Sequence, residues 1–129
     1  WCVGAKPQNK KDLIKSINLL EKREDIKLTW RKKVNNELMI NYKKIFKLID
    51  YKIYIKVPSF KHVFRWRLLQ EKKLSLKSKN KSVMKTNEVK RFIMFYERIT
   101  KDMMKNFKDN NIIIYLSNNH KIKSINIHD

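Results

Sequence analysis

Hydrophobic residues recur at spacings of three and four in four segments of the chain, which is the pattern of helices that bury one face. In the last of these segments Val89, Phe92, Ile93, Tyr96 and Ile99 form such a stripe. We therefore expect helices over about 10–22, 29–49, 60–71 and 87–107, with Thr29, Ser59 and Thr86 as N-caps.

Three other segments are rich in β-branched and aromatic residues, which favour strands. They cover residues 51–57, 111–116 and 121–127. The second is apolar throughout, as in a strand covered on both faces, and the third alternates as an edge strand does. Residues 117–120 between them have turn chemistry. Because helices separate the strands, we predict an α/β fold with a mainly parallel sheet covered by helices.

The first residues of the chain, 1–5, are small and apolar and read as the end of one more strand. Two or three strands do not by themselves close a core. We therefore expect the natural sheet to include further strands encoded upstream of Trp1.

The charge of the chain is weak evidence about its partner. The net charge of +20 over 129 residues would favour a polyanion such as nucleic acid. However, 26 of the 32 basic residues are Lys and only 6 are Arg, and Asn and Ile are also abundant. Lys, Asn and Ile all have A/T-rich codons, so a biased genome can account for the charge without selection for a polyanion, and a functional basic surface stays the alternative.

Several classes of site are absent from the sequence. Cys2 is the only cysteine, which excludes an internal disulfide and a cysteine-based zinc site and favours a reducing cytoplasm. His62, His120 and His128 are too scattered to suggest a metal site. No apolar run reaches the ~20 residues that cross a bilayer, and no signal peptide is present, so we expect no membrane partner.

The expected helix that follows Ser59 carries an unusual arginine. Arg67 lies on the same face as Phe60 and Phe64, where it needs an anion or a carboxylate as a partner. One interpretation is a ligand phosphate, and the other is an ion pair with Glu71 four residues on. The helix leads into a basic segment, 72–82, that we expect to be a flexible loop. This combination is typical of a lid that covers phosphates.

Blocks of residues along the chain carry a resemblance to a known family. The most specific block is Trp66-Arg67-Leu68-x-Gln70-Glu71, which follows Pro58-Ser59-Phe60. The others are Trp1-Cys2-Val3-Gly4-Ala5-x-Pro7-Gln8, Asn18-x-Leu20-Glu21, Trp30-Arg31-x-x-Val34-Asn35 and Tyr96-Glu97-Arg98-x-Thr100. Together they resemble the C-terminal half of the P-loop kinases that include D-glycerate 3-kinase and uridine kinase, over essentially the whole chain.

The resemblance implies a three-layer P-loop NTPase-type fold, in which residues 1–129 form the C-terminal portion of one kinase domain and about 59–86 form its lid. It also implies phosphoryl transfer from ATP, with Mg²⁺, to a hydroxyl of a small molecule, with a glycerate-type acceptor favoured. The family's Gly-rich phosphate loop cannot lie within the chain, because Gly4 is its only glycine. We therefore expect activity only when the chain is joined to a missing N-terminal half.

The same match suggests site residues. Arg67 matches the family's lid arginine and is predicted to be catalytic and to bind the ATP phosphates. Arg65 and Arg98 are further candidates for those phosphates, although the family more often has Gly or Gln in place of Arg65. The alternative roles are an ion pair for Arg67 and for Arg98 and a solvated charge for Arg65. For the acceptor candidates they are core packing for Trp1 and loop contacts for Asn18 and Glu21. The candidates for binding the acceptor are Trp1, Asn18 and Glu21.

A second hypothesis is a small basic module that binds nucleic acid. Its motivation is a set of aromatic residues interleaved with Lys and Arg, namely Tyr51, Tyr54, Phe60, Phe64 and Trp66. A nucleic-acid binder would expose these rings beside lysines. A kinase part would bury them and point Arg67 into a cleft at the C-terminal ends of the strands.

Overall fold

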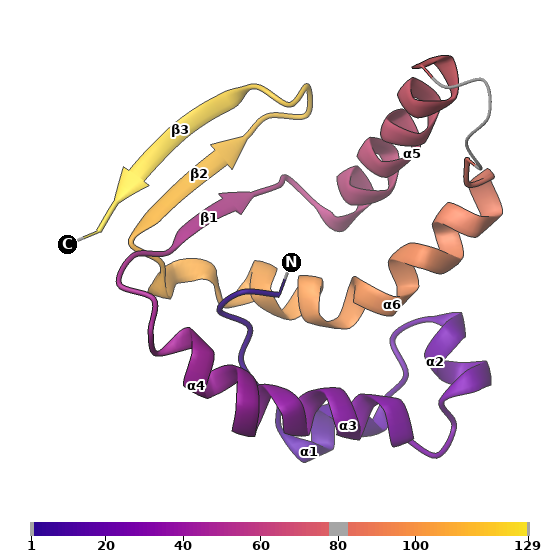
Figure 1. Cartoon of the computed structure of the whole chain (residues 1–129), viewed down its shortest axis with the longest axis vertical. Coiled ribbons are helices and arrows are strands. Elements are labelled where there is room, and N and C mark those ends of the chain that lie inside the picture. The colour runs from indigo at the N-terminus through magenta and orange to yellow at the C-terminus, as the bar shows by residue number, and fades with distance from the viewer. Residues whose placement is uncertain (1, 78–82, 129) are drawn as a thin grey trace.

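The computed structural model describes residues 2–77 and 83–128, which form a small sheet, a long helical hairpin and a group of short helices (Figure 1). The sheet has the strand order β1-β2-β3 and lies beside the hairpin. The short helices lie on the far side of the hairpin from the sheet. The strands are β1 (Ile53–Lys56), β2 (Ile112–Leu116) and β3 (Ile122–Ile127).

The sheet is mixed rather than mainly parallel. Strands β1 and β2 pair in parallel, as predicted, and β2 and β3 pair antiparallel. The antiparallel pairing follows from the tight turn at 117–120, in which the Ser117 N–H donates to the Lys121 carbonyl at 2.8 Å and His120 has a φ of 62°. The edge position of β3 confirms the prediction made from its alternating pattern. Strand β2 is central, but it is not covered on both faces as predicted, because Ile113 is buried while Ile112 and Ile114 on the other face are only half-buried.

Helices α5 (Phe60–Lys77) and α6 (Thr86–Lys105) pack against each other as an antiparallel hairpin (Figure 1). Helix α5 begins directly after Ser59, as predicted, but it continues through 72–77, where we expected a loop. The rest of that expected loop, 78–82, lies outside the described residues. The N-cap of α6 is Lys85, whose N–H donates to the Glu88 carboxylate at 2.6 Å, and the predicted cap, Thr86, is the first residue of the helix.

The segment expected to form one helix over 10–22 forms two, α1 (Lys10–Ile14) and α2 (Leu19–Glu24). The prediction was wrong because Asn18 starts a new helix: its side-chain oxygen accepts the Glu21 N–H at 3.0 Å. The Glu21 carboxylate in turn accepts the Ile17 N–H at 2.9 Å. Together these bonds satisfy donors at the start of α2 and separate it from α1.

The next helical stretch runs from Thr29 to Phe46 with a change of pitch in its middle. It consists of α3 (Thr29–Glu37), the π-helix η1 (Leu38–Tyr42) and α4 (Lys43–Phe46). Its first turn is capped by Asp25, which accepts the Trp30 and Arg31 N–H groups at 2.8 and 3.1 Å. The predicted cap, Thr29, is instead the first residue of the helix.

The start of the chain is a turn and not the strand that we expected. The Ala5 N–H donates to the Cys2 carbonyl at 3.0 Å, and Gly4 has a φ of 80°, a conformation that glycine adopts without strain. A short 3₁₀ helix, η2 (Phe107–Asp109), connects α6 to β2. Among the described residues, no helix has the length and apolar character needed to span a membrane.

Candidate functional site

A buried carboxylate, Glu21, connects the short helices to α6. Its two oxygens accept hydrogen bonds from Nε and Nη2 of Arg98, each at 2.7 Å, and Arg31 Nη1 lies 3.7 Å away. Burial alone would raise the pKa of Glu21. The bonds from Arg98 and the Ile17 N–H, with the charges of Arg98 and Arg31, outweigh burial and hold this pKa below its ordinary value.

Arg98 is fully engaged in this network. Besides Glu21, it donates to the carbonyls of Asp12 at 2.9 Å and Lys15 at 2.7 Å, and to the Gln8 side chain at 3.3 Å. Every N–H of its guanidinium therefore has an acceptor. In this arrangement Arg98 holds the loop between α1 and α2 against α6.

Arg31 has a similar role on the other side of Glu21. It donates to Asp25 at 2.8 Å and to the carbonyls of Leu13 at 2.8 Å and Asp25 at 2.6 Å. Burial would raise the pKa of Asp25, but the bonds from Arg31 and from the N–H groups of Trp30 and Arg31 lower it below its ordinary value. The sequence match pointed to the block that contains Arg31, but its burial could not be read from the sequence.

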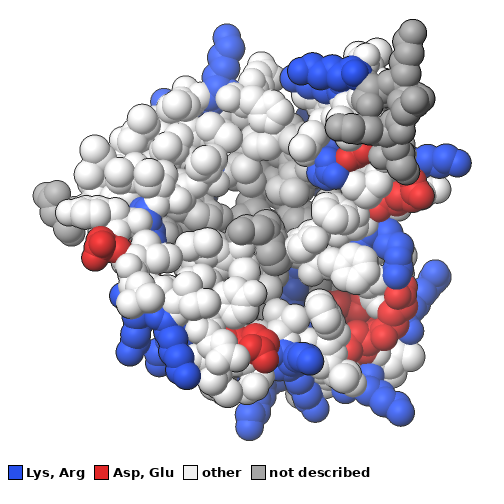
Figure 2. Space-filling view, viewed as in Figure 1, with Lys and Arg blue, Asp and Glu red and all other residues white. Residues whose placement is uncertain are grey.

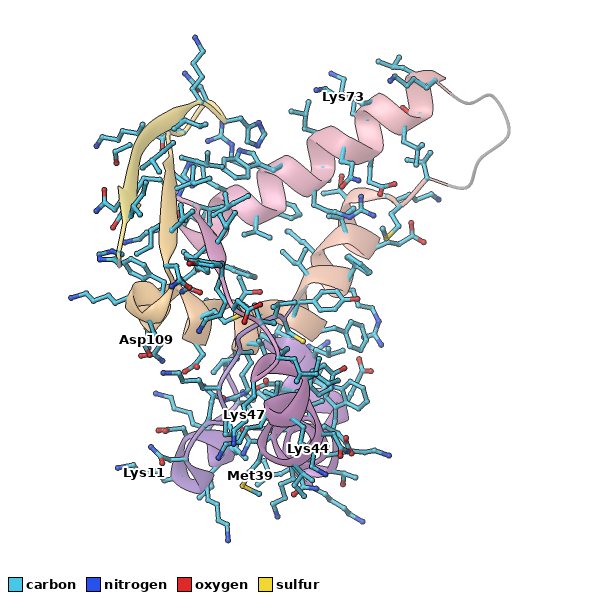
Figure 3. The ribbon with its side chains drawn as sticks, turned by 60° about the vertical axis from the view of Figure 1, so that its left-hand side comes forward. Lys11, Met39, Lys44, Lys47, Lys73 and Asp109 are labelled. Carbon is cyan, nitrogen blue, oxygen red and sulfur yellow. The ribbon has the colours of Figure 1, made fainter. Side chains whose placement is uncertain are left out.

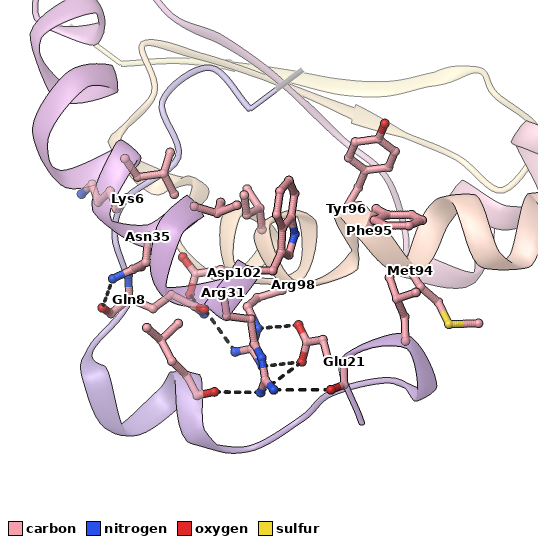
Figure 4. Close-up of a pocket in the computed structure, with 16 residues that line it drawn as sticks. Lys6, Gln8, Glu21, Arg31, Asn35, Met94, Phe95, Tyr96, Arg98 and Asp102 are labelled. Carbon is pink, nitrogen blue, oxygen red and sulfur yellow. Dashed lines mark hydrogen bonds and ion pairs between the residues drawn. The ribbon is translucent and has the colours of Figure 1, made fainter. Parts of the chain in front are cut away.

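A cavity of about 420 Å³ lies between α3 and α6, and we call it the α3–α6 pocket (Figure 4). Glu21, Arg31 and Arg98 line it, as do the apolar side chains Trp30, Val34 and Ile99. Its polar wall includes Gln8, Asn35 and Asp102.

Hydrogen bonds fix that polar wall. Gln8 donates to Asp102 at 3.1 Å through its side chain, and its N–H donates to the side-chain oxygen of Asn35 at 2.7 Å. The Asn35 amide also donates to the Gln8 carbonyl at 3.1 Å. These polar groups are therefore held in place beside the charged and apolar side chains of the cavity, as in sites that orient a small ligand. Of the residues predicted from the sequence, Glu21 and Arg98 line this pocket.

A second cavity, of about 580 Å³, lies between the N-terminal half of α5 and α6, and we call it the α5–α6 pocket. Its charged lining consists of three cations, Lys61, Arg65 and Lys90, and one carboxylate, Glu97. Its floor is apolar, with Phe60, Phe64, Ile93 and Met94. Within the described part of the chain, none of the three cations has a carboxylate partner.

The α5–α6 pocket brings together two residues that the sequence predicted for different roles, Asn18 and Arg65. Asn18 donates to the Met94 carbonyl and to Glu97, both at 3.0 Å, so it fastens α2 to α6 at one end of the pocket. The same carboxylate also pairs with Lys101 at 2.6 Å. Lys61 and Lys90 were not predicted, because isolated lysines in a lysine-rich chain carry no distinguishing signal.

Arg67 lines neither of these two pockets. Its guanidinium lies 2.5 Å from the Glu71 carboxylate, donates to Gln70 at 3.0 Å and stacks 5.3 Å from the centre of the Phe92 ring. Glu71 is buried and also accepts the Met84 N–H at 2.9 Å. The ion pair expected from the i,i+4 spacing is thus present, and the role of Arg67 towards phosphates stays a prediction. Trp1, predicted to contact the acceptor, lies outside the described residues.

The aromatic residues of the nucleic-acid hypothesis do not share one surface, and the hypothesis stays a prediction. Phe60 and Phe64 are half-buried and line the α5–α6 pocket beside Lys61 and Arg65. Tyr51 is exposed, but the Tyr54 ring stacks on Phe107 at 5.7 Å and the Trp66 ring packs against His120 at 3.7 Å. The basic side chains are dispersed around the outline of the molecule (Figure 2). Four exposed lysines labelled in Figure 3 come from three parts of the chain, Lys11 in α1, Lys44 and Lys47 at α4, and Lys73 in α5.

No protein-family model matches the chain, and no curated protein matches it. Among solved structures, it is similar to D-glycerate 3-kinase from Cryptococcus neoformans var. grubii, with a TM-score of 0.74 and 18% sequence identity. The similarity covers 99% of this chain and 48% of that chain, so this chain spans about half the length of the kinase. The chain therefore has a kinase-like α/β fold.

Proposed function

We propose that the chain supplies about half of an ATP-dependent kinase that phosphorylates a hydroxyl of a small molecule, with a glycerate-type acceptor favoured. The observation that carries this proposal is the fold likeness to D-glycerate 3-kinase, which extends over 99% of the chain. The block of residues around Arg67 that resembles the lid of this kinase family supports it independently.

The α5–α6 pocket fits the anionic part of such a ligand. Lys61, Arg65 and Lys90 are exposed and supply positive charge without a carboxylate partner in the described residues, beside an apolar floor. When bound, ATP would supply the transferable phosphoryl group. Arg65, together with Lys61 and Lys90, would hold its phosphate oxygens.

The described residues do not supply a site for Mg²⁺. No group of three or more His, Cys, Asp or Glu side chains within 2–77 and 83–128 is placed to hold a metal ion. We therefore assign no residue of this chain as a metal ligand and derive no step through the metal.

Two further roles, stabilisation of the transition state and orientation of the acceptor, are proposed for Arg67 and for residues at the α3–α6 pocket. The resemblance alone assigns Arg67 to the phosphate oxygens, where negative charge spreads in the transition state. Because Arg67 lies outside both pockets and pairs with Glu71, this role requires the ion pair to open. Asn18 and Glu21 would orient the acceptor, Glu21 from the α3–α6 pocket and Asn18 from the turn that connects the two pockets. Arg98 would act as a positioning residue for Glu21 rather than contact phosphate, because its N–H groups are all bonded.

The decisive experiment is to read the coding DNA upstream of Trp1 and assay the longest encoded product. We expect an in-frame G-x-x-x-x-G-K-[ST] loop, and formation of phosphoglycerate from D-glycerate and ATP-Mg, followed by ³¹P NMR. The 129-residue chain alone should not turn over ATP, since its single glycine cannot form that loop. A product that carries the loop but leaves glycerate and other small hydroxy compounds unphosphorylated would contradict the proposal.

A further inference from the structure

The α3–α6 pocket carries a carboxylate that has no cation as a partner (Figure 4). Asp102 lies on α6, one turn after Arg98, and one of its oxygens accepts the Gln8 side-chain N–H at 3.1 Å. In the described part of the chain, its other oxygen accepts no hydrogen bond and no lysine or arginine forms an ion pair with it. Lys105 and Lys108 line a neighbouring cavity that shares Asp102, but they do not line the α3–α6 pocket.

The cations of the pocket are already neutralised. Each of the three has a carboxylate as its partner: Arg31 has Asp25, Arg98 has Glu21 and Lys6 has Asp109. Asp102 is therefore a fourth carboxylate beside three cations. The pocket thus has an excess of negative charge, although the chain as a whole has a net charge of +20. Such an excess favours a ligand with a positive charge.

The rest of the lining favours a ligand that also has an apolar body. Trp30, Phe95 and Tyr96 bring three aromatic rings to the pocket, beside aliphatic side chains that include Val34 and Ile99. The face of an aromatic ring attracts a cation, and Trp does so most strongly. The aliphatic side chains would bury apolar surface of the ligand. The volume of about 420 Å³ lies within the range of sites for small molecules.

We propose that the α3–α6 pocket binds an organic amine, a small molecule with an aromatic or aliphatic body and an ammonium group that donates a hydrogen bond to Asp102. A metal ion does not fit this place, because no group of three or more His, Cys, Asp or Glu among the described residues is positioned to hold one. The proposed binding does not depend on phosphoryl transfer. One consequence rests on the proposed function: a bound amine would occupy the pocket from which Glu21 orients the acceptor, and would compete with that acceptor.

The first test compares three probes that share a phenyl ring: 2-phenylethylamine, 2-phenylethanol and phenylacetate. Each is titrated into the complete protein, and ¹H–¹⁵N NMR spectra give the affinity and the location of binding. The amine should bind at least about tenfold more tightly than phenylacetate, because only the amine forms a charge-assisted hydrogen bond with Asp102. The largest shifts should be those of the Trp30 indole N–H and the backbone N–H of Asp102. Equal affinities for the amine and phenylacetate, shifts confined to other residues, or no binding of the amine would overturn the proposal.

The second test separates the charge of Asp102 from its other contacts. Asp102→Asn keeps an acceptor for Gln8 but removes the charge, so it should weaken binding of 2-phenylethylamine by about tenfold and leave binding of 2-phenylethanol unchanged. Asp50→Asn, the matched control, removes an exposed carboxylate that does not line the pocket and should affect neither probe. Unchanged affinity of folded Asp102→Asn for the amine would overturn the role of Asp102.

A third variant tests the aromatic part of the site and does not alter the buried contacts of the fold. Trp30 is 55% exposed, so Trp30→Ala should fold and should weaken binding of both 2-phenylethylamine and 2-phenylethanol. Unchanged affinities for both probes, with unchanged circular dichroism, would overturn the assigned pocket. All of these measurements detect binding, so they succeed or fail independently of kinase activity.

Discussion

Arg98 on α6 donates two hydrogen bonds of 2.7 Å to Glu21 on α2, one to each carboxylate oxygen. The two residues are 77 positions apart in the sequence. The pair is buried, and no buried polar side-chain atom of the described residues lacks a hydrogen bond. It holds the group of short helices against the hairpin. It also forms one wall of the α3–α6 pocket, so the stability of the fold and the shape of the candidate site depend on the same contact.

Glu21→Gln should lower the free energy of unfolding by about 3–5 kcal/mol, because the substitution leaves the buried charge of Arg98 without its carboxylate, whereas Arg31 keeps Asp25. Urea unfolding followed by circular dichroism measures this loss. The matched control is Glu24→Gln on the same helix, which removes an exposed pair with Arg91 (2.8 Å between Glu24 Oε2 and Arg91 Nη2). The control should leave stability nearly unchanged. Equal effects of the two substitutions would show that burial of the Glu21 pair is not stabilising.

Stability should fall with acid in a defined window. The pKa values of Glu21 and Asp25 are both lower in the folded chain than their ordinary values of 4.5 and 3.8. The unfolded chain therefore binds more protons, and stability rises with pH in this range. The contribution of these groups is complete above about pH 5 and is lost as pH falls through the folded pKa values. Melting temperatures between pH 3 and pH 7 test this slope, which should be shallower in Glu21→Gln.

Arg65→Ala and Lys90→Ala should each weaken binding of ATP-Mg to the complete protein by about tenfold or more, because each removes a charged donor from the α5–α6 pocket. Titration calorimetry gives the dissociation constants. Arg23→Ala removes an exposed arginine of α2 that does not line the pocket, and should have little effect. If all three substitutions weaken binding equally, net charge and not the pocket attracts the nucleotide.

Arg67→Ala should lower kcat of the complete kinase by about 10²–10³ with little change in KM, since its proposed contact strengthens in the transition state. Arg67→Lys should recover part of the loss, because lysine keeps the charge but not the planar fork. A purely structural role predicts a different result: Arg67→Ala and Glu71→Gln would then lower the melting temperature alike and leave kcat of the folded fraction unchanged. Arg91→Ala is the matched control for removal of an arginine.

Local pattern was enough to predict the main elements. The isoleucine-rich runs became β1, β2 and β3, and the stripe from Val89 to Ile99 became α6, because hydrophobic period depends only on neighbouring residues. The pair of Arg67 with Glu71 was also predictable, since four residues along a helix bring two side chains together. The length of α5 was not, because the basic residues of 72–77 suit a solvated helix as well as a loop.

Contacts between distant segments were decided only by the tertiary structure. Asp25 rather than Thr29 caps α3, and Asn18 divides the expected helix 10–22, because side-chain bonds to the backbone compete with helical ones in ways that periodicity does not record. The sequence by itself determined the α/β class, the strands and the candidate arginines. Only the tertiary structure decided that Arg98 donates hydrogen bonds to Glu21 while Arg65 lines the α5–α6 pocket. Both outcomes depend on which helices pack together and which side chains they bury.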